Sequence, residues 1–235
     1  WIDTDDILKG GEHLRKIIDA ATKGNIEAVY LNYVYQSEFD KKEICETCHQ
    51  PIKDEYHVKH IIIEHLRERL VRNNGKYKWI APIHETLIEQ VPTNKTDNHD
   101  AYVLHTAEHK DRMTSLTRNV RNLELAVYQT KGKDPRHVYY LAKVYFDMGT
   151  NDDLERAIPL IQQYLWGEDK SGWPEERAQA CEYLAEIYRK LGQHNNAVKA
   201  AMNALIEQPE TSSVFVNLAT TYMIRKEWQR ALFWV

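Results

Sequence analysis

Three similar segments decide the fold of the C-terminal half: YLAKVYFDMG (140–149), YLAEIYRKLG (183–192) and NLATTYMIRK (217–226). They align as Leu-Ala-x-x-Tyr, beginning at Leu141, Leu184 and Leu218. The interval from 184 to 218 is 34 residues, a period typical of stacked helix-turn-helix units, and the interval from 141 to 184 is 43. The pattern predicts pairs of packed helices.

The nine additional residues of the longer interval divide between two places. Three lie between Gly149 and Ala157, and the other six fall near WGEDKSGWPEE (166–176), a connection that contains glycine and proline. Small residues recur where paired helices must approach closely: Ala142, Ala157, Ala185, Ala197, Ala219 and Ala231. Residues 113–235 resemble tetratricopeptide repeats, which implies an all-α region that binds a protein partner or associates with itself.

Composition indicates a soluble globular protein. Hydrophobic residues make up 43% of the 235 residues and charged residues 28%, and the net charge is −4, which gives no sign of nucleic-acid binding. No apolar run reaches the roughly 20 residues that span a bilayer, and no signal peptide is evident. The odd number of cysteines, three, favours a reducing cytoplasm over a secreted location.

The first half has a different pattern, which predicts an α/β domain over 1–112. The runs 28–36, 78–83 and 101–106 are rich in valine, isoleucine and aromatic residues and are expected to be strands. The run 10–21 has helical spacing of its apolar residues.

The chain opens with Trp1-Ile2 followed by Asp3, Asp5 and Asp6. These carboxylates fit the end of a strand, where alternate residues point to the same side and converge on one cation. They also fit the N-cap of the following helix, where aspartate is favoured.

A second polar stretch spans 65–87. It contains three arginines, an Asn-Asn-Gly turn at 73–75 and a His-Glu pair: Arg67, Arg69, Arg72, His84 and Glu85. Taken alone, it fits a β-hairpin with a cationic edge strand.

The order of these motifs resembles family 2 glycosyltransferases of GT-A fold with C-terminal tetratricopeptide repeats. An acidic Asp-x-Asp-Asp segment, an arginine-rich segment, Trp-x-x-x-x-His-Glu and a repeat tail follow one another across 1–235. The resemblance implies that the chain is N-terminally truncated, because the nucleotide-binding half precedes the acidic segment in that family. It also implies hexosyl transfer with inversion, from a nucleotide sugar (UDP-linked by default) to a glycan, protein or modified-nucleobase acceptor.

The resemblance assigns roles to individual residues. Asp3 and Asp5 form a DxD motif that would hold Mn²⁺ or Mg²⁺ and the donor diphosphate. Asp6 would contact the sugar, and Glu85, beside His84, would be the base that deprotonates the acceptor. His105 is expected as a further metal ligand, with a polar strand end as the alternative. The three arginines would pair with donor phosphates, or would be solvated at the surface: Arg67, Arg69 and Arg72.

Relative to the glycosyltransferase pattern, residues 40–65 look like an insertion, and this insertion could hold zinc. Cys45-x-x-Cys48 precedes His57 and His60, and together they offer a Cys₂His₂ set for structural Zn²⁺. Free cysteines in a polar loop are the alternative.

Two functions of different class follow from these patterns. One is a metal-dependent glycosyltransferase. The other is a non-catalytic repeat protein that acts as an interaction scaffold, with a degenerate α/β half.

Overall fold

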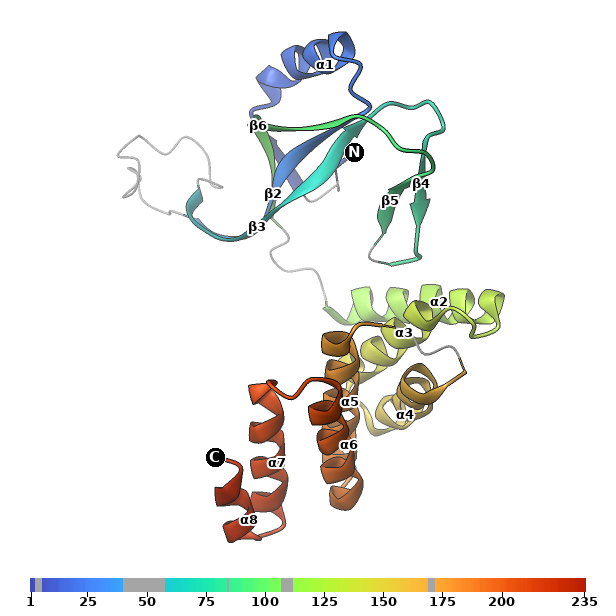
Figure 1. Cartoon of the computed structure of the whole chain (residues 1–235), viewed down its shortest axis with the longest axis vertical. Helices are drawn as coiled ribbons and strands as arrows, with labels where there is room; N and C mark the ends of the chain where they lie inside the picture. Colours follow the sequence, from blue (N-terminus) through green and yellow to red (C-terminus); the bar gives the residue numbers. More distant parts are fainter. Residues whose placement is uncertain (3–5, 40–57, 84, 107–111, 169–171) are drawn as a thin grey trace. The chain divides into compact units, whose positions relative to one another are not determined.

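The computed structural model covers residues 1–235 and describes all of them except 3–5, 40–57, 84, 107–111 and 169–171 (Figure 1). The chain forms two compact units. The sheet unit consists of Trp1–Ile80 and Glu85–Lys110, and the repeat unit of Ala81–His84 and Asp111–Val235. Each unit is built around a hydrophobic cluster of its own.

The sheet unit contains a four-stranded sheet with the order β1-β6-β2-β3. Its strands are β1 (Asp6–Lys9), β2 (Ala28–Phe39), β3 (Val58–Val71) and β6 (Lys95–His105). β6 runs parallel to β2, whereas the β1–β6 and β2–β3 pairs are antiparallel. The sheet is therefore mixed, with the last strand of the unit in an inner position.

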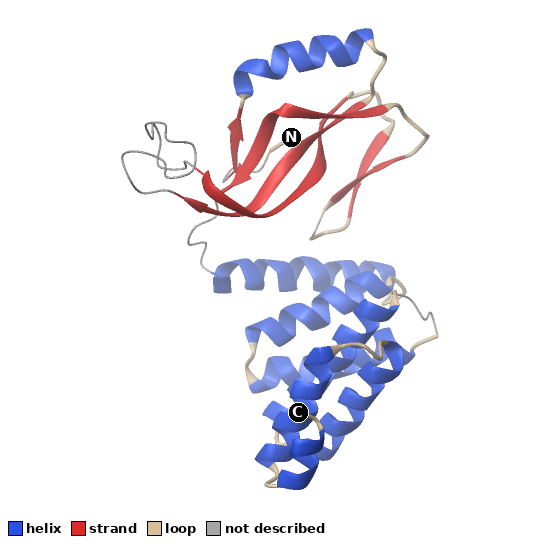
Figure 2. Ribbon diagram, turned by 60° about the vertical axis from the view of Figure 1, so that its left-hand side comes forward, coloured by secondary structure: helices blue, strands red, loops and turns tan. Residues whose placement is uncertain are grey.

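A single described helix, α1 (Leu14–Lys23), follows a 3₁₀ turn, η1 (Gly11–His13), and packs against the sheet (Figure 2). Ile17 is the buried residue of α1 and joins Val29, Leu31 and Ala101 in the core of the unit. Between β3 and β6 the chain forms a separate two-stranded sheet of β4 (Tyr77–Ile80) and β5 (Thr86–Glu89). The apolar stripe of α1 thus covers strands that are far apart in sequence.

This topology corrects the predicted fold class. The sequence predicts that residues 1–112 form the C-terminal part of an α/β domain, a class in which mostly parallel strands are joined by helical crossovers. Among the described strands, two of the three neighbouring pairs in the main sheet are antiparallel, and the larger part of the chain is helical. The GT-A prediction is therefore wrong.

The described residues of the opening segment, Trp1, Ile2 and Asp6, differ from both interpretations. Trp1 and Ile2 are 38% and 44% exposed and lie outside any strand, so they do not end a buried strand. Asp6 begins β1 and does not cap a helix, because α1 starts at Leu14 after His13.

The Asn-Asn-Gly turn does not join a hairpin of β3 and β4. β3 pairs with β2, and β4 pairs with β5. The turn is instead held by Glu27. Its carboxylate accepts hydrogen bonds from Asn74 Nδ2 and Lys76 Nζ, both at 2.7 Å. The turn signal was correct locally, but the pairing of the strands was set elsewhere.

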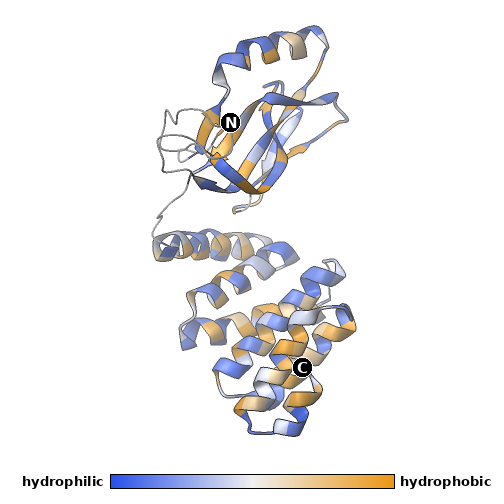
Figure 3. Ribbon diagram, turned by 90° about the vertical axis from the view of Figure 1, so that its left-hand side faces the viewer, coloured by the Kyte–Doolittle hydropathy of each residue, from blue (hydrophilic) through white to orange (hydrophobic). Residues whose placement is uncertain are grey.

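The repeat unit is all-α. It consists of α2 (Arg112–Thr130), α3 (Pro135–Met148), α4 (Asn151–Trp166), α5 (Pro174–Lys190), α6 (His194–Glu207), α7 (Ser212–Ile224) and α8 (Trp228–Phe233). α3 pairs with α4, α5 with α6 and α7 with α8, and each pair contacts the next. Leu141, Leu184 and Leu218 are at most 4% exposed, so the repeated leucine lies in the core each time. Figure 3 shows hydrophobic residues along these helices.

Local signals fix the ends of the helices. The Asp134 carboxylate accepts from the amides of Arg136 and His137, and Pro135 occupies the first helical position of α3. Gly149 ends α3 in the left-handed region, at φ 76°. The three equivalent alanines of α4, α6 and α8 are at most 5% exposed and allow close approach of the helices: Ala157, Ala197 and Ala231.

No helix in the described part of the chain is both long and apolar enough to cross a membrane. A cytoplasmic location stays a prediction.

Candidate functional site

Asp6 and His105 meet at one end of the sheet. They are direct partners in the β1–β6 register, and His105 Nδ1 lies 2.8 Å from Asp6 Oδ1. Because a carboxylate only accepts, the imidazole donates its Nδ1–H. The Asp6 side chain is fully buried, and its Oδ2 has no hydrogen-bond partner among the described residues. The carboxylate of this pair is therefore buried, whereas the His105 side chain is 26% exposed.

Aromatic side chains surround the pair. The Tyr33 hydroxyl lies 3.1 Å from His105 Nδ1, and the Tyr35 ring stacks on the imidazole with centroids 5.3 Å apart. The His65 ring meets Tyr33 edge-on, and its pKa is lowered by burial and then by the nearby charges of Arg67 and Arg69. Sequence reasoning missed Tyr33, Tyr35 and His65. The alternation of β2 could have indicated the two tyrosines.

Two of the predicted arginines are held by contacts within the unit. The Arg69 guanidinium lies between the Trp1 and Tyr33 rings, 4.1 and 4.3 Å from their centroids. Arg72 donates to the carbonyl oxygens of Ile26 and Thr22. Their predicted role in phosphate binding stays a prediction.

Arg69 and Arg72 also line a cavity of about 470 Å³. Its walls include Trp1 and Trp79, whose rings meet edge to face with centroids 4.7 Å apart. Arg67 is not among the lining residues. It donates to the carbonyl oxygen of Glu85 at 3.5 Å, and its guanidinium lies 5.9 Å from the Trp1 ring centroid.

The remaining predicted residues are separate from this cluster or fall outside the described part of the chain. Glu85 is exposed, and His60 lies in β3 opposite Glu38. Outside the described residues lie Asp3, Asp5, Cys45, Cys48, His57 and His84. The described residues hold no group of three or more histidine, cysteine or acidic side chains suited to a metal ion. Binding of Mn²⁺, Mg²⁺ or Zn²⁺ stays a prediction.

The repeat unit offers a second candidate site, which we call the α3–α5–α7 face. It is formed where the first helices of the three hairpins lie side by side. The Tyr139 hydroxyl of α3 donates to Gln179 Oε1 of α5, at 2.8 Å. The Glu182 carboxylate of α5 accepts from Ser213 Oγ and Asn217 Nδ2 of α7, at 2.9 and 3.1 Å. These side-chain bonds hold three separate helices in one surface.

A cavity of about 400 Å³ lies on this face, between α3 and the start of α5. It is lined by aromatic, acidic and amide side chains and one lysine: Tyr139, Tyr140, Lys143, Trp173, Glu175, Glu176 and Gln179. Glu176 is 8% exposed and accepts a hydrogen bond from Tyr164 of α4. Burial, more than neighbouring charge, holds the pKa of Tyr139 well above its usual range.

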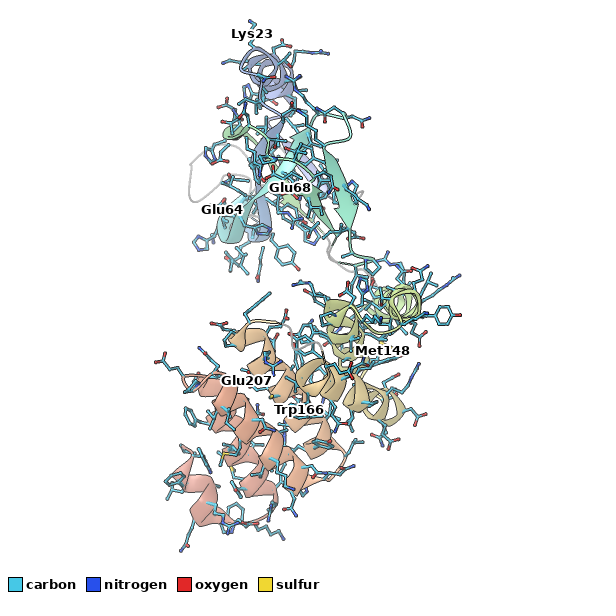
Figure 4. The ribbon with its side chains drawn as sticks, turned by 45° about the vertical axis from the view of Figure 1, so that its right-hand side comes forward. Lys23, Glu64, Glu68, Met148, Trp166 and Glu207 are labelled. Carbon is cyan, nitrogen blue, oxygen red and sulfur yellow. The ribbon has the colours of Figure 1, made fainter. Side chains whose placement is uncertain are left out.

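Sequence reasoning treated Trp173, Glu175 and Glu176 as part of a connection. Pro174 was the available signal, because proline is favoured at the first position of a helix. α5 begins at that residue, and the Arg177 guanidinium, one turn later, is joined to the Glu207 carboxylate of α6 at 2.7 Å. Figure 4 labels Glu207 on α6.

Comparison with known proteins gives structural matches only. No family model matches the chain, and no curated protein matches it. A crystal structure of MamA has a TM-score of 0.44 and 16% identity, with 54% of this chain and 72% of that one covered. MamA of AMB-1 gives 0.44 and 17%, with 52% and 62% covered. BtubC from P. vanneervenii gives 0.38 and 21%, with 52% of each chain covered.

The predicted membership of family 2 glycosyltransferases is wrong. The described sheet is not that of a GT-A domain, because two of its three neighbouring strand pairs are antiparallel. The predicted sugar-transferring enzyme rested on that resemblance and is wrong as well. The role of Asp3 and Asp5, which lie outside the described residues, stays a prediction. The described helix pairs between Arg112 and Phe233 are compatible with the other function, a repeat protein that acts as an interaction scaffold.

Proposed function

We propose that the chain is a non-catalytic scaffold that holds a protein partner on the α3–α5–α7 face. The observation that carries this proposal is the row of side-chain bonds that joins the first helices of three successive hairpins. Tyr139 is bonded to Gln179, and Glu182 to Ser213 and Asn217. A surface built in this way is wide and has a fixed shape, which suits an extended partner better than a small substrate.

The face also has contact groups of the kinds that interfaces use. Tyr140 and Trp173 are aromatic residues at its surface, and Trp173 is 52% exposed. Val216 of α7 is 66% exposed. Tyrosine and tryptophan are enriched in interfaces, where a large rigid ring gives contact area at little entropic cost.

Site-specific photo-crosslinking tests the proposal. A photoreactive phenylalanine replaces Tyr140 or Val216 on the face, and Tyr128 on α2, which is 81% exposed, serves as the matched aromatic control. We expect one partner to be captured from both face positions and not from Tyr128. The captured protein, once purified, should bind the unmodified chain in calorimetry. Equal capture from all three positions, or no binding of the purified protein, would contradict the proposal.

Self-association is a second candidate, and the surface of α8 favours it. Three apolar side chains are strongly exposed there: Trp228 at 62%, Leu232 at 76% and Phe233 at 78%. A contiguous apolar surface of this kind is typical of a protein–protein contact. Light scattering over a range of concentrations, with Leu232→Ser/Phe233→Ser as the variant, separates a dimer from a monomer. A mass that is independent of concentration and of the substitutions would remove this candidate.

A further inference from the structure

The cavity between α3 and α5 has the chemistry of a site for one cationic side chain. We propose that it receives an arginine of the partner protein. The proposal rests on the proposed scaffold function and deepens it, because it names what the α3–α5–α7 face recognises.

The aromatic wall is the first part of the argument. Tyr139, Tyr140 and Trp173 line the cavity together, and aromatic faces attract cations through their quadrupole. The chain already uses two of these rings in this way. The guanidinium carbon of Arg136 lies 5.3 Å from the Tyr140 ring centroid and 5.9 Å from that of Trp173. Arg136 itself is not among the residues that line the cavity, so the cavity remains a separate space beside it.

The charges of the lining are the second part. Glu175 and Glu176 contribute two carboxylates and Lys143 one ammonium, so the lining carries an excess of negative charge. Lys143 Nζ is 3.5 Å from Asp147 Oδ2 on the same helix, which offsets its charge. An anionic guest would meet two carboxylates, whereas a cation would be attracted by both the rings and the acids.

Two polar groups of the lining, Glu176 and Gln179, already accept hydrogen bonds within the repeat unit. The Glu176 carboxylate accepts the Tyr164 hydroxyl, and Gln179 Oε1 accepts the Tyr139 hydroxyl. Gly172, at φ +86°, lets the backbone pass close to this network, since a Cβ there would lie 1.9 Å from the Tyr164 hydroxyl oxygen. The residue before Trp173 is therefore restricted to glycine.

Arginine fits better than lysine for a geometric reason. Its guanidinium is planar and stacks on aromatic rings while its N–H groups remain directed at carboxylates in the same plane. A lysine ammonium is a more strongly hydrated point charge and would lose more hydration in a cavity of this size.

Fluorine NMR of the full chain labelled with 5-fluorotryptophan tests the proposal, with Trp173→Phe to assign the Trp173 signal. The probes are acetyl-Gly-Arg-Gly-amide and three matched peptides with citrulline, lysine or glutamate in the central position. Citrulline keeps the shape of arginine and removes its charge. We expect the arginine peptide to shift the Trp173 signal saturably, the lysine peptide to bind more weakly, and the citrulline and glutamate peptides to cause no saturable shift.

Substitutions make the test specific. Glu175 is exposed, so Glu175→Gln should leave the fold intact and weaken arginine binding about fivefold, the effect of removing one favourable charge interaction. Glu155→Gln, at an exposed position of α4, is the control and should bind as the unmodified chain does. Binding of citrulline as tightly as arginine, an unchanged affinity in Glu175→Gln, or no shift with arginine would overturn the proposal.

The two proposals can fail separately. Capture of a partner at Tyr140 and Val216 without arginine binding would leave the scaffold function and remove the arginine site. Saturable arginine binding at Trp173 without any captured partner would leave the site and remove the scaffold function.

Discussion

The hydroxyl of Tyr164 in α4 donates a hydrogen bond to the carboxylate of Glu176 in α5, and both residues are buried. Burial, and then the bond to Glu176, raises the pKa of Tyr164 above its usual range. The bond joins the second helix of one hairpin to the first helix of the next. It therefore helps to set the position of α5 and of the cavity that Glu176 lines.

Tyr164→Phe should destabilise the repeat unit by about 1–3 kcal/mol, because it leaves a buried carboxylate oxygen without its donor. Urea unfolding followed by far-UV circular dichroism measures the change. Tyr128→Phe, at an 81% exposed position, is the matched control and should change stability by less than about 0.5 kcal/mol. Equal stability of the two variants would show that the bond contributes nothing net.

The repeat unit should lose stability in alkaline solution. Burial raises the pKa of the Cys181 thiol from 9.0 to about 12 and that of Tyr183 from 10.0 to about 12. Groups whose pKa is raised on folding stabilise the fold below their unfolded values, and this contribution is lost as pH rises toward about 12. The free energy of unfolding should therefore fall steadily with pH from about 9 upward.

A substitution separates the contribution of the Cys181 thiol to the pH dependence from that of Tyr183. Cys181→Ala removes one titrating group, so its free energy of unfolding should depend less steeply on pH in this range. A slope equal to that of the unmodified chain would contradict the role of Cys181.

The ion pair between α5 and α6 should contribute more to the stability of the repeat unit than an exposed charge does. Arg177 Nε and Nη2 donate to the two Glu207 carboxylate oxygens, at 2.9 and 2.7 Å, and Nη2 also donates to the Leu165 carbonyl oxygen. Arg177→Ala should cost about 1–3 kcal/mol of stability in urea unfolding, and Arg177→Lys should restore only part of it, because lysine lacks the planar fork. Arg118→Ala, at an exposed site of α2, should change stability by less than about 0.5 kcal/mol.

Asp6→Ala should loosen the end of the sheet. It removes the carboxylate that accepts from His105 Nδ1 and lies 3.5 Å from the Tyr33 hydroxyl, so we expect a loss of about 1–3 kcal/mol. Amide hydrogen exchange in β6 measures the local stability. Asp19→Ala, on the exposed side of α1, is the control. Protection of β6 that is equal in both variants would mean that the pair does not stabilise the strand.

The predicted zinc set can be tested by metal analysis of the purified chain. If Cys45, Cys48, His57 and His60 bind zinc as predicted, the chain should contain one equivalent, and Cys45→Ser/Cys48→Ser should abolish it. Cys181→Ser, at a buried site in the repeat unit, is the matched control and should keep the metal. Zinc content that is the same in both variants would dispose of the site.

The helical hairpins could be predicted from sequence because their signals are local. The leucine and alanine of each repeat, such as Leu184 and Ala185, are buried by the neighbouring helices, and the same spacing that identified them sets the helix face. Gly149 ends α3 because glycine adopts the left-handed conformation easily, which is a property of that single residue.

The sheet could not be predicted in the same way. Residues 28–36 and 101–105 do lie in strands, yet nothing in their composition indicates that β2 and β6 are parallel neighbours. The short acidic, basic and His-Glu motifs suggested a family because they resemble, in the same order, the motifs of family 2 glycosyltransferases. Each motif is compatible with several folds, and the pairing of strands decided between them.

The candidate sites depended on this distant pairing. Asp6 and His105 are 99 residues apart in the chain and meet only because β1 and β6 are in register. Trp173 and Tyr140 share a cavity only because two hairpins stack. Such contacts have no periodic signal in a single sequence.

The inner position of β6 has a consequence for synthesis. In the described sheet β6 lies between β1 and β2, although it is the last of the strands to leave the ribosome. Among the described strands, β1 therefore has no partner until residue 105 has emerged, and the sheet is completed by its last strand. The hairpins that follow rely on contacts between near neighbours in the chain and can form as they appear, so the rate-limiting event in maturation should be the insertion of β6.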